Sequence, residues 1–117
     1  SVIAIHWVAI AMQSSIETKR KNEMDYKKFN GTSYRGCFKM PYAKLVEAIG
    51  EPNLIGDGYK TDVEWGFERD GVVATIYNWK NGPNYIGLGT VEDIDDWNVG
   101  GHSLDAMDVV SALLMQR

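Results

Sequence analysis

The 117-residue sequence predicts a single α+β domain, with an antiparallel sheet built around an Asp-Gly hairpin and helices packed mainly on one face. From Lys60 to Arg69, apolar and acidic side chains alternate, which is typical of a half-buried strand. Asp70-Gly71 supplies the positive φ angles of a two-residue turn, and Val72 to Trp79 returns as the second strand. Leucine, methionine and valine recur at helical spacing between Leu104 and Leu114.

The two faces of this hairpin differ in character. A two-residue turn places Trp65 opposite Ile76 and Phe67 opposite Ala74 on the core face. Tyr77 and Trp79 then project from the other face, away from the core. The cross-strand pairs expected there are Glu64 with Tyr77, Glu68 with Val73 and Asp62 with Trp79.

The segments before the hairpin carry weaker signals at first. Residues 2–10 are apolar on both alternating faces, so they predict a buried strand or a short core or interface helix. Residues 14–28 predict a helix with a thin apolar stripe, which Asn30-Gly31 ends. A strand follows from Ser33 to Lys39. Pro41 then opens a helix from Tyr42 to Ile49, and residues 51–58 form a loop.

After the hairpin, Asn81 to Asn84 form a turn, and Tyr85 to Gly89 are weakly strand-like. Ile94 to Val99 predict another strand, which Gly100-Gly101 interrupts, and Ser103 caps the last helix. No repeat or linker divides the chain. We therefore expect one domain over residues 1–117, made of an N-terminal arm (residues 1–30) and an α+β core (residues 33–117). The arm would cover its own sheet or a neighbouring subunit.

Composition excludes several classes of protein. The sequence is 44% hydrophobic and 24% charged, as in a folded globular protein. A single cysteine, Cys37, excludes an intrachain disulfide and predicts a buried structural thiol. The longest apolar run, Val2 to Met12, is about half the length that spans a bilayer. These features predict a cytoplasmic protein with no membrane partner.

Charge is unevenly distributed. Residues 1–44 carry eight basic and three acidic residues, whereas residues 45–117 carry four basic and thirteen acidic ones. The net charge of −4 therefore separates into +5 and −9. One interpretation of the two parts is a pair of solvated faces, or subunits that associate through opposite charges. The other is an anion site in the basic part. A homo-oligomer is expected.

No motif specifies catalysis or a metal. His6 and His102 lie far apart and share no ligand spacing with carboxylates, and no nucleophile elbow or Walker loop is present. Glu64 and Glu68 on one strand face are a weak acid/base pair. The run Glu92 to Asp96 is best interpreted as solvated charge. We expect no catalytic residue, no metal and no cofactor.

The surface aromatics are the more suggestive feature. An exposed tryptophan is covered by the protein's own arm or helices, by a partner subunit or by a stacked ligand. Aromatics near cations suit planar, phosphorylated ligands, because rings stack and cations neutralise phosphate. The residues predicted to bind such a ligand are Tyr77, Trp79, Tyr85, Lys60, Lys80, Arg35, His102 and Ser103.

One resemblance adds to this. The strings Asp57-Gly-Tyr-Lys, Glu64-Trp, Asp70-Gly, Val73-Ala-Thr-Ile-Tyr-Asn-Trp-Lys and Trp97-Asn-Val-Gly-Gly-His resemble a family of small proteins of tailed bacteriophages. The resemblance covers about residues 33–115 and assigns no catalytic residues. It implies a counter-defence role. Such proteins trap a cyclic-nucleotide or ADP-ribose-type immune signal between subunits, inhibit a host enzyme, or degrade the signal.

The leading hypothesis is thus a non-enzymatic binder of a nucleotide-derived signal. One alternative is a protein inhibitor that uses the acidic C-terminal part. Another is a metal-independent enzyme that degrades the signal with His6 or His102 and a nearby glutamate. Specific nucleic-acid binding ranks lowest, because the net charge is negative and no recognition helix is evident.

Overall fold

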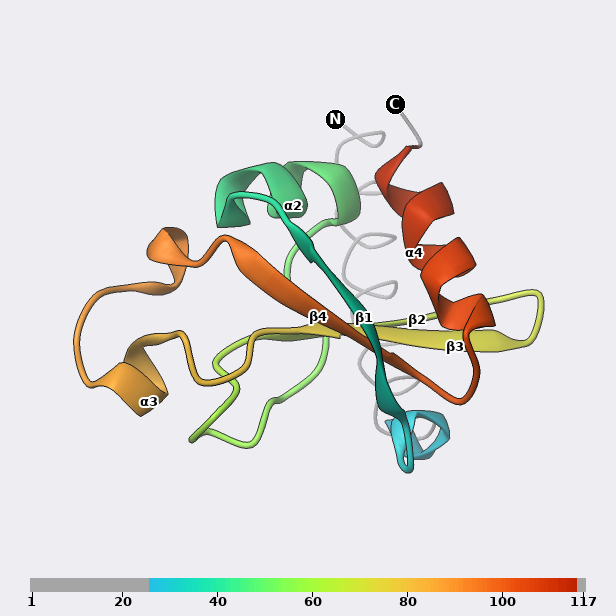
Figure 1. Ribbon diagram of the computed structural model, residues 1–117, viewed down its shortest axis with the longest axis horizontal. Helices are drawn as coiled ribbons and strands as arrows, with labels where there is room; N and C mark the ends of the chain where they lie inside the picture. Colours follow the sequence, from blue (N-terminus) through green and yellow to red (C-terminus); the bar gives the residue numbers. More distant parts are fainter. Residues whose placement is uncertain (1–25, 116–117) are drawn as a thin grey trace, which may run out of the picture.

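The computed structural model describes residues 26–115 and contains one four-stranded antiparallel sheet in the order β1-β4-β3-β2 (Figure 1). The predicted α+β class is confirmed. The Asp-Gly hairpin joins β2 to β3, so it forms one half of the sheet, with β2 at an edge. The strands are β1 (Ser33–Lys39), β2 (Glu64–Arg69), β3 (Val72–Tyr77) and β4 (Asp96–Gly101).

Within residues 26–115, five short helices precede, connect or follow these strands. Figure 1 shows α2 and α4 on the same side of the sheet, while α3 lies at the far end of the molecule from α4. The helices are η1 (Tyr26–Phe29), α2 (Tyr42–Ile49), α3 (Pro83–Ile86), η2 (Val91–Asp93) and α4 (Asp105–Leu114).

Two buried tryptophans tie the core to α2. Trp65 and Trp97 meet edge to face, with ring centroids 5.4 Å apart, and neither is exposed to solvent. The indole N–H of Trp97 donates to the carbonyl oxygen of Met40 at 2.7 Å, just before α2. The indole N–H of Trp65 donates to the carbonyl oxygen of Gly50 at 2.8 Å, just after α2. Each buried indole thus satisfies its donor at one end of the helix, which fixes α2 on the sheet.

The glycines of β4 allow the close approach of α4. A Cβ atom at Gly101 would lie 2.4 Å from the Cβ of Ala106 and 3.1 Å from the carbonyl oxygen of Val73. The predicted break at Gly100-Gly101 is therefore wrong, because both glycines belong to the strand. Gly101 fits beneath α4 only without a side chain, whereas a Cβ at Gly100 would meet Thr75 Oγ1 at 2.5 Å on the other face. Ala106, Val109 and Val110 are the buried residues of α4.

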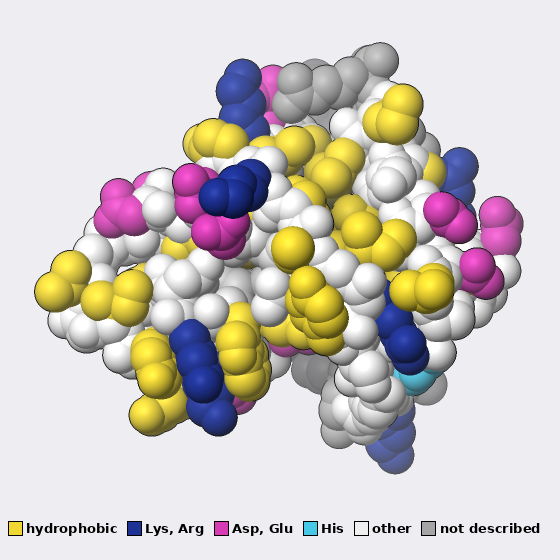
Figure 2. Space-filling view, viewed as in Figure 1, with side chains coloured by type: hydrophobic (Ala, Val, Ile, Leu, Met, Phe, Trp, Pro, Cys, Tyr) yellow, Lys and Arg dark blue, Asp and Glu magenta, His cyan; other side chains and the backbone are white. Residues whose placement is uncertain are grey.

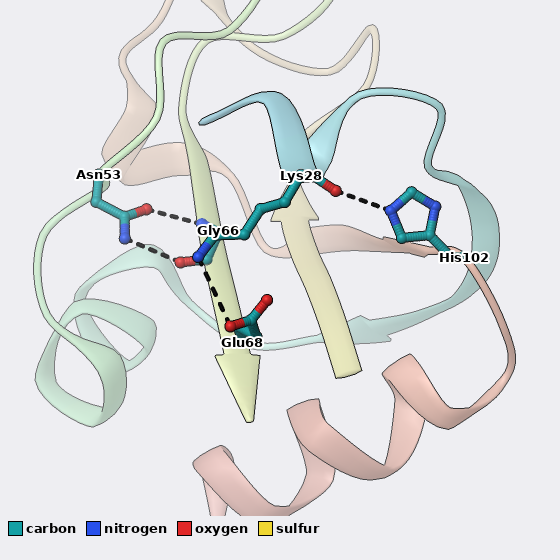
Figure 3. A network of polar contacts seen from close by, with 5 residues as sticks. All are labelled: Lys28, Asn53, Gly66, Glu68 and His102. Carbon is teal, nitrogen blue, oxygen red and sulfur yellow. Dashed lines mark hydrogen bonds and ion pairs between the residues drawn. The ribbon is translucent and has the colours of Figure 1, made fainter. Parts of the chain in front are cut away.

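The opposite face is partly covered by η1 and the loop before β2. The side-chain oxygen of Asn53 accepts the backbone N–H of Gly66 at 2.7 Å, and its amide group donates to the carbonyl oxygen of Gly66 at 2.9 Å (Figure 3). A Cβ on Gly66 would meet Leu54 at 2.6 Å and Phe29 at 2.7 Å. The edge strand β2 is therefore covered around Gly66 by backbone-mimicking hydrogen bonds and two apolar side chains.

The hairpin register is as predicted over the whole ladder, from Glu64 opposite Tyr77 to Arg69 opposite Val72. Asp70 and Gly71 have φ angles of 52° and 80°, as the two central residues of this hairpin turn require. The predicted strand Ser33 to Lys39 and helix Tyr42 to Ile49 are also confirmed.

Other boundaries differ. The first hairpin strand begins at Glu64 rather than Lys60, and the second ends at Tyr77 rather than Trp79. The segment 85–89 is no strand, because Pro83 opens the short helix α3 instead. The last strand covers Asp96–Gly101 rather than Ile94 to Val99.

Three side-chain predictions are also corrected. Cys37 is exposed, because it lies on the face of β1 opposite α2 and α4. Leu104 is 70% exposed, since it precedes α4 instead of belonging to its packed stripe. The hydroxyl of Ser103 accepts the N–H of Asp105 at 3.3 Å, but the residue before the helix is Leu104.

The predictions for residues 2–10 and 14–25 lie outside the described residues. Of the predicted helix 14–28, the described end is the 3-10 helix η1, and Gly31 has the positive φ of the expected turn. Across residues 26–115 no helix is long and apolar enough to cross a bilayer.

Candidate ligand-binding site

Four aromatic rings and two lysines gather beyond the ends of β2 and β3, and we refer to them as the aromatic–lysine cluster. Five of the eight predicted ligand-binding residues belong to it. Figure 2 shows basic side chains flanked by hydrophobic ones in the region of α3. The members are Tyr59, Lys60, Tyr77, Trp79, Lys80 and Tyr85.

The cluster is centred on Trp79. The ammonium nitrogen of Lys60 lies 5.3 Å from the centroid of the Trp79 ring, and that of Lys80 lies 6.0 Å from it. Lys80 also lies 5.8 Å from the ring of Tyr85. Cation–π pairs of this kind at exposed sites contribute about 0.5–1 kcal/mol each. They hold two positive charges beside an aromatic surface.

These rings remain accessible. Trp79 and Tyr85 are each 44% exposed, and Tyr59 is 59% exposed. Tyr77 is half-buried, and it meets Trp79 edge to face with centroids 6.3 Å apart. Tyr59 and Tyr85 make a similar contact at 5.6 Å. The cluster therefore has a semi-rigid base and an open rim.

A buried asparagine fastens the two loops that carry the cluster. Asn78 is fully buried, and its side-chain oxygen accepts the backbone N–H of Asp62 at 2.7 Å and of Val63 at 3.1 Å. Its amide group donates to Asp62 Oδ1 at 2.8 Å and to Asn81 Oδ1 at 3.2 Å. The segment before β2 and the segment after β3 are thus joined through one satisfied polar group.

Further hydrogen bonds shape the turn after Trp79. Asp62 Oδ2 accepts the N–H of Asn84 at 2.9 Å, and the N–H of Lys80 donates to the carbonyl oxygen of Lys60 at 2.8 Å. Lys80 has a φ of 59°, in the left-handed region that non-glycine residues rarely adopt. This conformation places its ammonium group between Trp79 and Tyr85.

Asp57 organises the loop that presents Tyr59 and Lys60. Its Oδ1 accepts the backbone N–H groups of Thr61 at 2.9 Å, Tyr59 at 2.9 Å and Lys60 at 2.8 Å. These hydrogen bonds, that from Thr61 foremost, hold the pKa of Asp57 below its ordinary value. The carboxylate is therefore ionised and occupied by its own loop.

A row of polar side chains runs from the cluster across the sheet. Glu64, Tyr77, Asn98 and Cys37 are successive cross-strand partners on β2, β3, β4 and β1. Burial, and then the charge of Asp57, raise the pKa of Glu64 to about 7. Burial and the charge of Glu64 raise the pKa of Tyr77, whereas a hydrogen bond with Asn98 acts to lower it. Glu64 is thus the titrating group at the rim of the cluster.

The other three predicted binding residues lie elsewhere. The Nε of Arg35 donates to the carbonyl oxygen of Gly101 at 3.0 Å, and His102 Nε2 lies 2.8 Å from the carbonyl oxygen of Lys28 (Figure 3). Gly101 pairs with Ala74 at the start of β3, whereas the cluster lies past its end. From Ala74 to Trp79 is five residues, which is roughly 17 Å along the strand direction at about 3.3 Å per residue. Arg35, His102 and Ser103 have structural hydrogen bonds there.

Sequence reasoning missed Asn78. Alternation along the strand placed it on the core face, where an asparagine is unusual, and this was the available signal for a buried hydrogen-bonding role. Among the described side chains, no group of three or more potential ligands is placed to hold a metal ion. The geometry of the cluster suits stacking and charge neutralisation.

Comparison with protein-family models gives no match, and neither the curated proteins nor the solved structures provide one.

Proposed function

We propose that the aromatic–lysine cluster binds a nucleotide-derived anion and that the protein sequesters it without chemical change. The observation that carries the proposal is the placement of Lys60 and Lys80 over Trp79, a ring that is 44% exposed. A base stacked on Trp79 or Tyr85 has its phosphate within reach of two ammonium groups. Each stacked base contributes about 1–3 kcal/mol, independently of its sequence.

The resemblance to small tailed-phage proteins supports a counter-defence role. In an infected cell, trapping is most effective against an immune signal that the host produces in small amounts. Cyclic nucleotides and ADP-ribose derivatives combine a planar base with phosphates, as the cluster requires. We propose the host cytoplasm as the site of action and a homo-oligomer as the binding form, with its mass measured by light scattering.

Calorimetric titration tests the binding. Cyclic mono- and dinucleotides and ADP-ribose are each added to the full chain, and at least one is expected to bind. Trp79→Ala should weaken that binding roughly 5- to 100-fold, whereas Trp79→Phe should retain most of it. Lys60→Ala and Lys80→Ala should weaken it further at low salt.

Lys44→Ala is the matched control for the lysine variants. Lys44 is an exposed lysine of α2, on the other face of the sheet, so its removal should change nothing. Chromatography of the ligand recovered from the complex separates trapping from catalysis. Altered ligand, or equal affinity of the Trp79→Ala variant, would overturn the proposal.

A further inference from the structure

We infer that Glu64 selects the base of the bound nucleotide and favours guanine, whose Watson–Crick edge presents two adjacent N–H donors. The inference rests on the proposed function, because it places the base on the aromatic–lysine cluster. It assigns Glu64 a specificity-determining role at the rim of that cluster.

The first step is the position of Glu64. It lies directly opposite Tyr77 in the β2–β3 ladder, and cross-strand partners have Cβ atoms about 5 Å apart. The ring of Tyr77 contacts Trp79, which follows it by two residues. The carboxyl group of Glu64 therefore lies on the sheet face beside the stacking surface, where the edge of a stacked base would be.

The second step is that this carboxyl group lacks donors, unlike the neighbouring ones. Asp57 accepts three backbone N–H groups, Asp62 accepts from Asn78 and Asn84, and Glu68 pairs with Lys28 at 3.8 Å. Within residues 26–115 no hydrogen bond or ion pair reaches the carboxyl group of Glu64. The Glu64 side chain is only partly exposed.

The third step concerns the charged groups around it. Asp57 from the preceding loop and Tyr77 from β3 face Glu64, and the cation nearest the stacking surface, Lys60, lies over Trp79. Burial and Asp57 raise the pKa of Glu64 to about 7, as expected for a carboxylate without donors. A ligand that supplies donors would reverse this shift and stabilise the carboxylate.

The fourth step is the match to a base. A carboxylate has two acceptor oxygens side by side, and charge-assisted hydrogen bonds to it are the stronger kind. Guanine offers N1–H and the N2 amino group as two adjacent donors. Adenine, cytosine and uracil each pair a donor with an acceptor there, so one carboxylate oxygen would face a lone pair. Hypoxanthine keeps N1–H but has only C2–H in place of the amino group, so the second oxygen would gain no donor. Guanine is also a large stacking surface for Trp79.

The test uses GMP and IMP, which differ only in the N2 amino group. At pH 8, calorimetry should show GMP binding roughly 10- to 100-fold more tightly than IMP, the value of one hydrogen bond to a charged group. The preference should shrink at pH 6, where Glu64 is mostly protonated. Glu64→Gln replaces one acceptor with a donor, so it should abolish both the preference and its pH dependence.

The outcomes separate the two proposals. If GMP and IMP bind equally and Trp79→Ala weakens both, the stacking site stands and the role of Glu64 is wrong. Tighter binding of AMP than of GMP overturns it as well. If neither GMP nor IMP binds, guanine selection is refuted, and the proposed function then depends on the cyclic nucleotides and ADP-ribose. Circular dichroism of Glu64→Gln confirms that the variant is folded.

Discussion

Two hydrogen bonds join Asn78 to Asp62: the side-chain amide of Asn78 donates to Asp62 Oδ1 at 2.8 Å, and its oxygen accepts the backbone N–H of Asp62 at 2.7 Å. One link is side chain to side chain and the other is side chain to backbone. Together they fix the loop that carries Lys60 against the turn that carries Trp79. The cluster therefore depends on a residue that is itself fully buried.

Replacing Asn78 with Ala should be strongly destabilising. The backbone N–H groups of Asp62 and Val63 would lose their acceptor in a buried environment. Leaving buried polar groups unsatisfied costs about 1–3 kcal/mol each, so we expect a loss of roughly 2–6 kcal/mol in the free energy of unfolding. Urea denaturation measures it. Asn81→Ala, which removes more exposed hydrogen bonds, is the control and should cost about 1 kcal/mol or less.

Gly101 and Gly36 form a second matched pair. A methyl group at Gly101 would meet the Cβ of Ala106 at 2.4 Å and backbone oxygen at 3.1 Å, neither of which can move aside. At Gly36 it would meet Met107 Sδ at 2.6 Å, the flexible end of a side chain. Gly101→Ala should therefore lower the free energy of unfolding by about 2–3 kcal/mol, and Gly36→Ala by about 1 kcal/mol or less. A ranking in the opposite order in urea denaturation would contradict the proposed packing of α4.

The hairpin was predictable because local signals agreed. Alternation, the Asp70-Gly71 turn and β-branched residues all indicate one register, and the ladder from Glu64 to Arg69 has that register. The glycines of β4 were misjudged for the opposite reason. Gly100 and Gly101 signal a chain break locally, yet both lie within the strand, Gly101 against Ala106 of α4 and Gly100 against Thr75 of β3. Local patterns carry no information about such contacts.

The candidate site divides in the same way. Tyr77, Trp79 and Lys80 are adjacent in sequence, so their proximity was predictable from the strand alone. Arg35 and His102 were chosen for their chemistry, but the register of β4 with β3 places them near Ala74, roughly 17 Å along the strand direction from Trp79. Asn78 was missed because its function is to join two loops, which the sequence does not place together.

Stability should decrease as pH rises through the range in which Glu64 titrates. Its pKa is about 7 in the folded protein against an ordinary value of 4.5, so the folded state binds the extra proton between these values. Since stability falls with pH where the folded state binds more protons, we expect a loss between pH 4.5 and 7. Because Glu64 is partly solvated, the loss is discounted to roughly 1–2 kcal/mol.

Glu64→Gln isolates this contribution. The amide cannot ionise, so the variant should match the wild-type protein near pH 5 and exceed it in stability by about 1–2 kcal/mol at pH 8. Urea denaturation at both pH values measures the difference. Glu68→Gln, on the same strand and paired with Lys28, is the control, and it should show no such gain at pH 8. If the difference in the free energy of unfolding between the wild-type protein and Glu64→Gln were the same at both pH values, the pKa of Glu64 would not be raised in the folded protein.

The left-handed conformation of Lys80 gives a prediction that separates folding from binding. A side chain at a φ of 59° costs about 1 kcal/mol relative to glycine, which adopts this region freely. The free energy of unfolding of Lys80→Gly should therefore be about 1 kcal/mol higher than that of Lys80→Ala, which keeps the strained backbone. Both variants lose the ammonium group over Trp79 and Tyr85, so both should bind GMP equally weakly. Urea denaturation gives the first comparison and calorimetry the second. If Lys80→Gly were the less stable variant, the turn would not have the backbone described; if it bound GMP as well as the wild-type protein does, Lys80 would hold no phosphate.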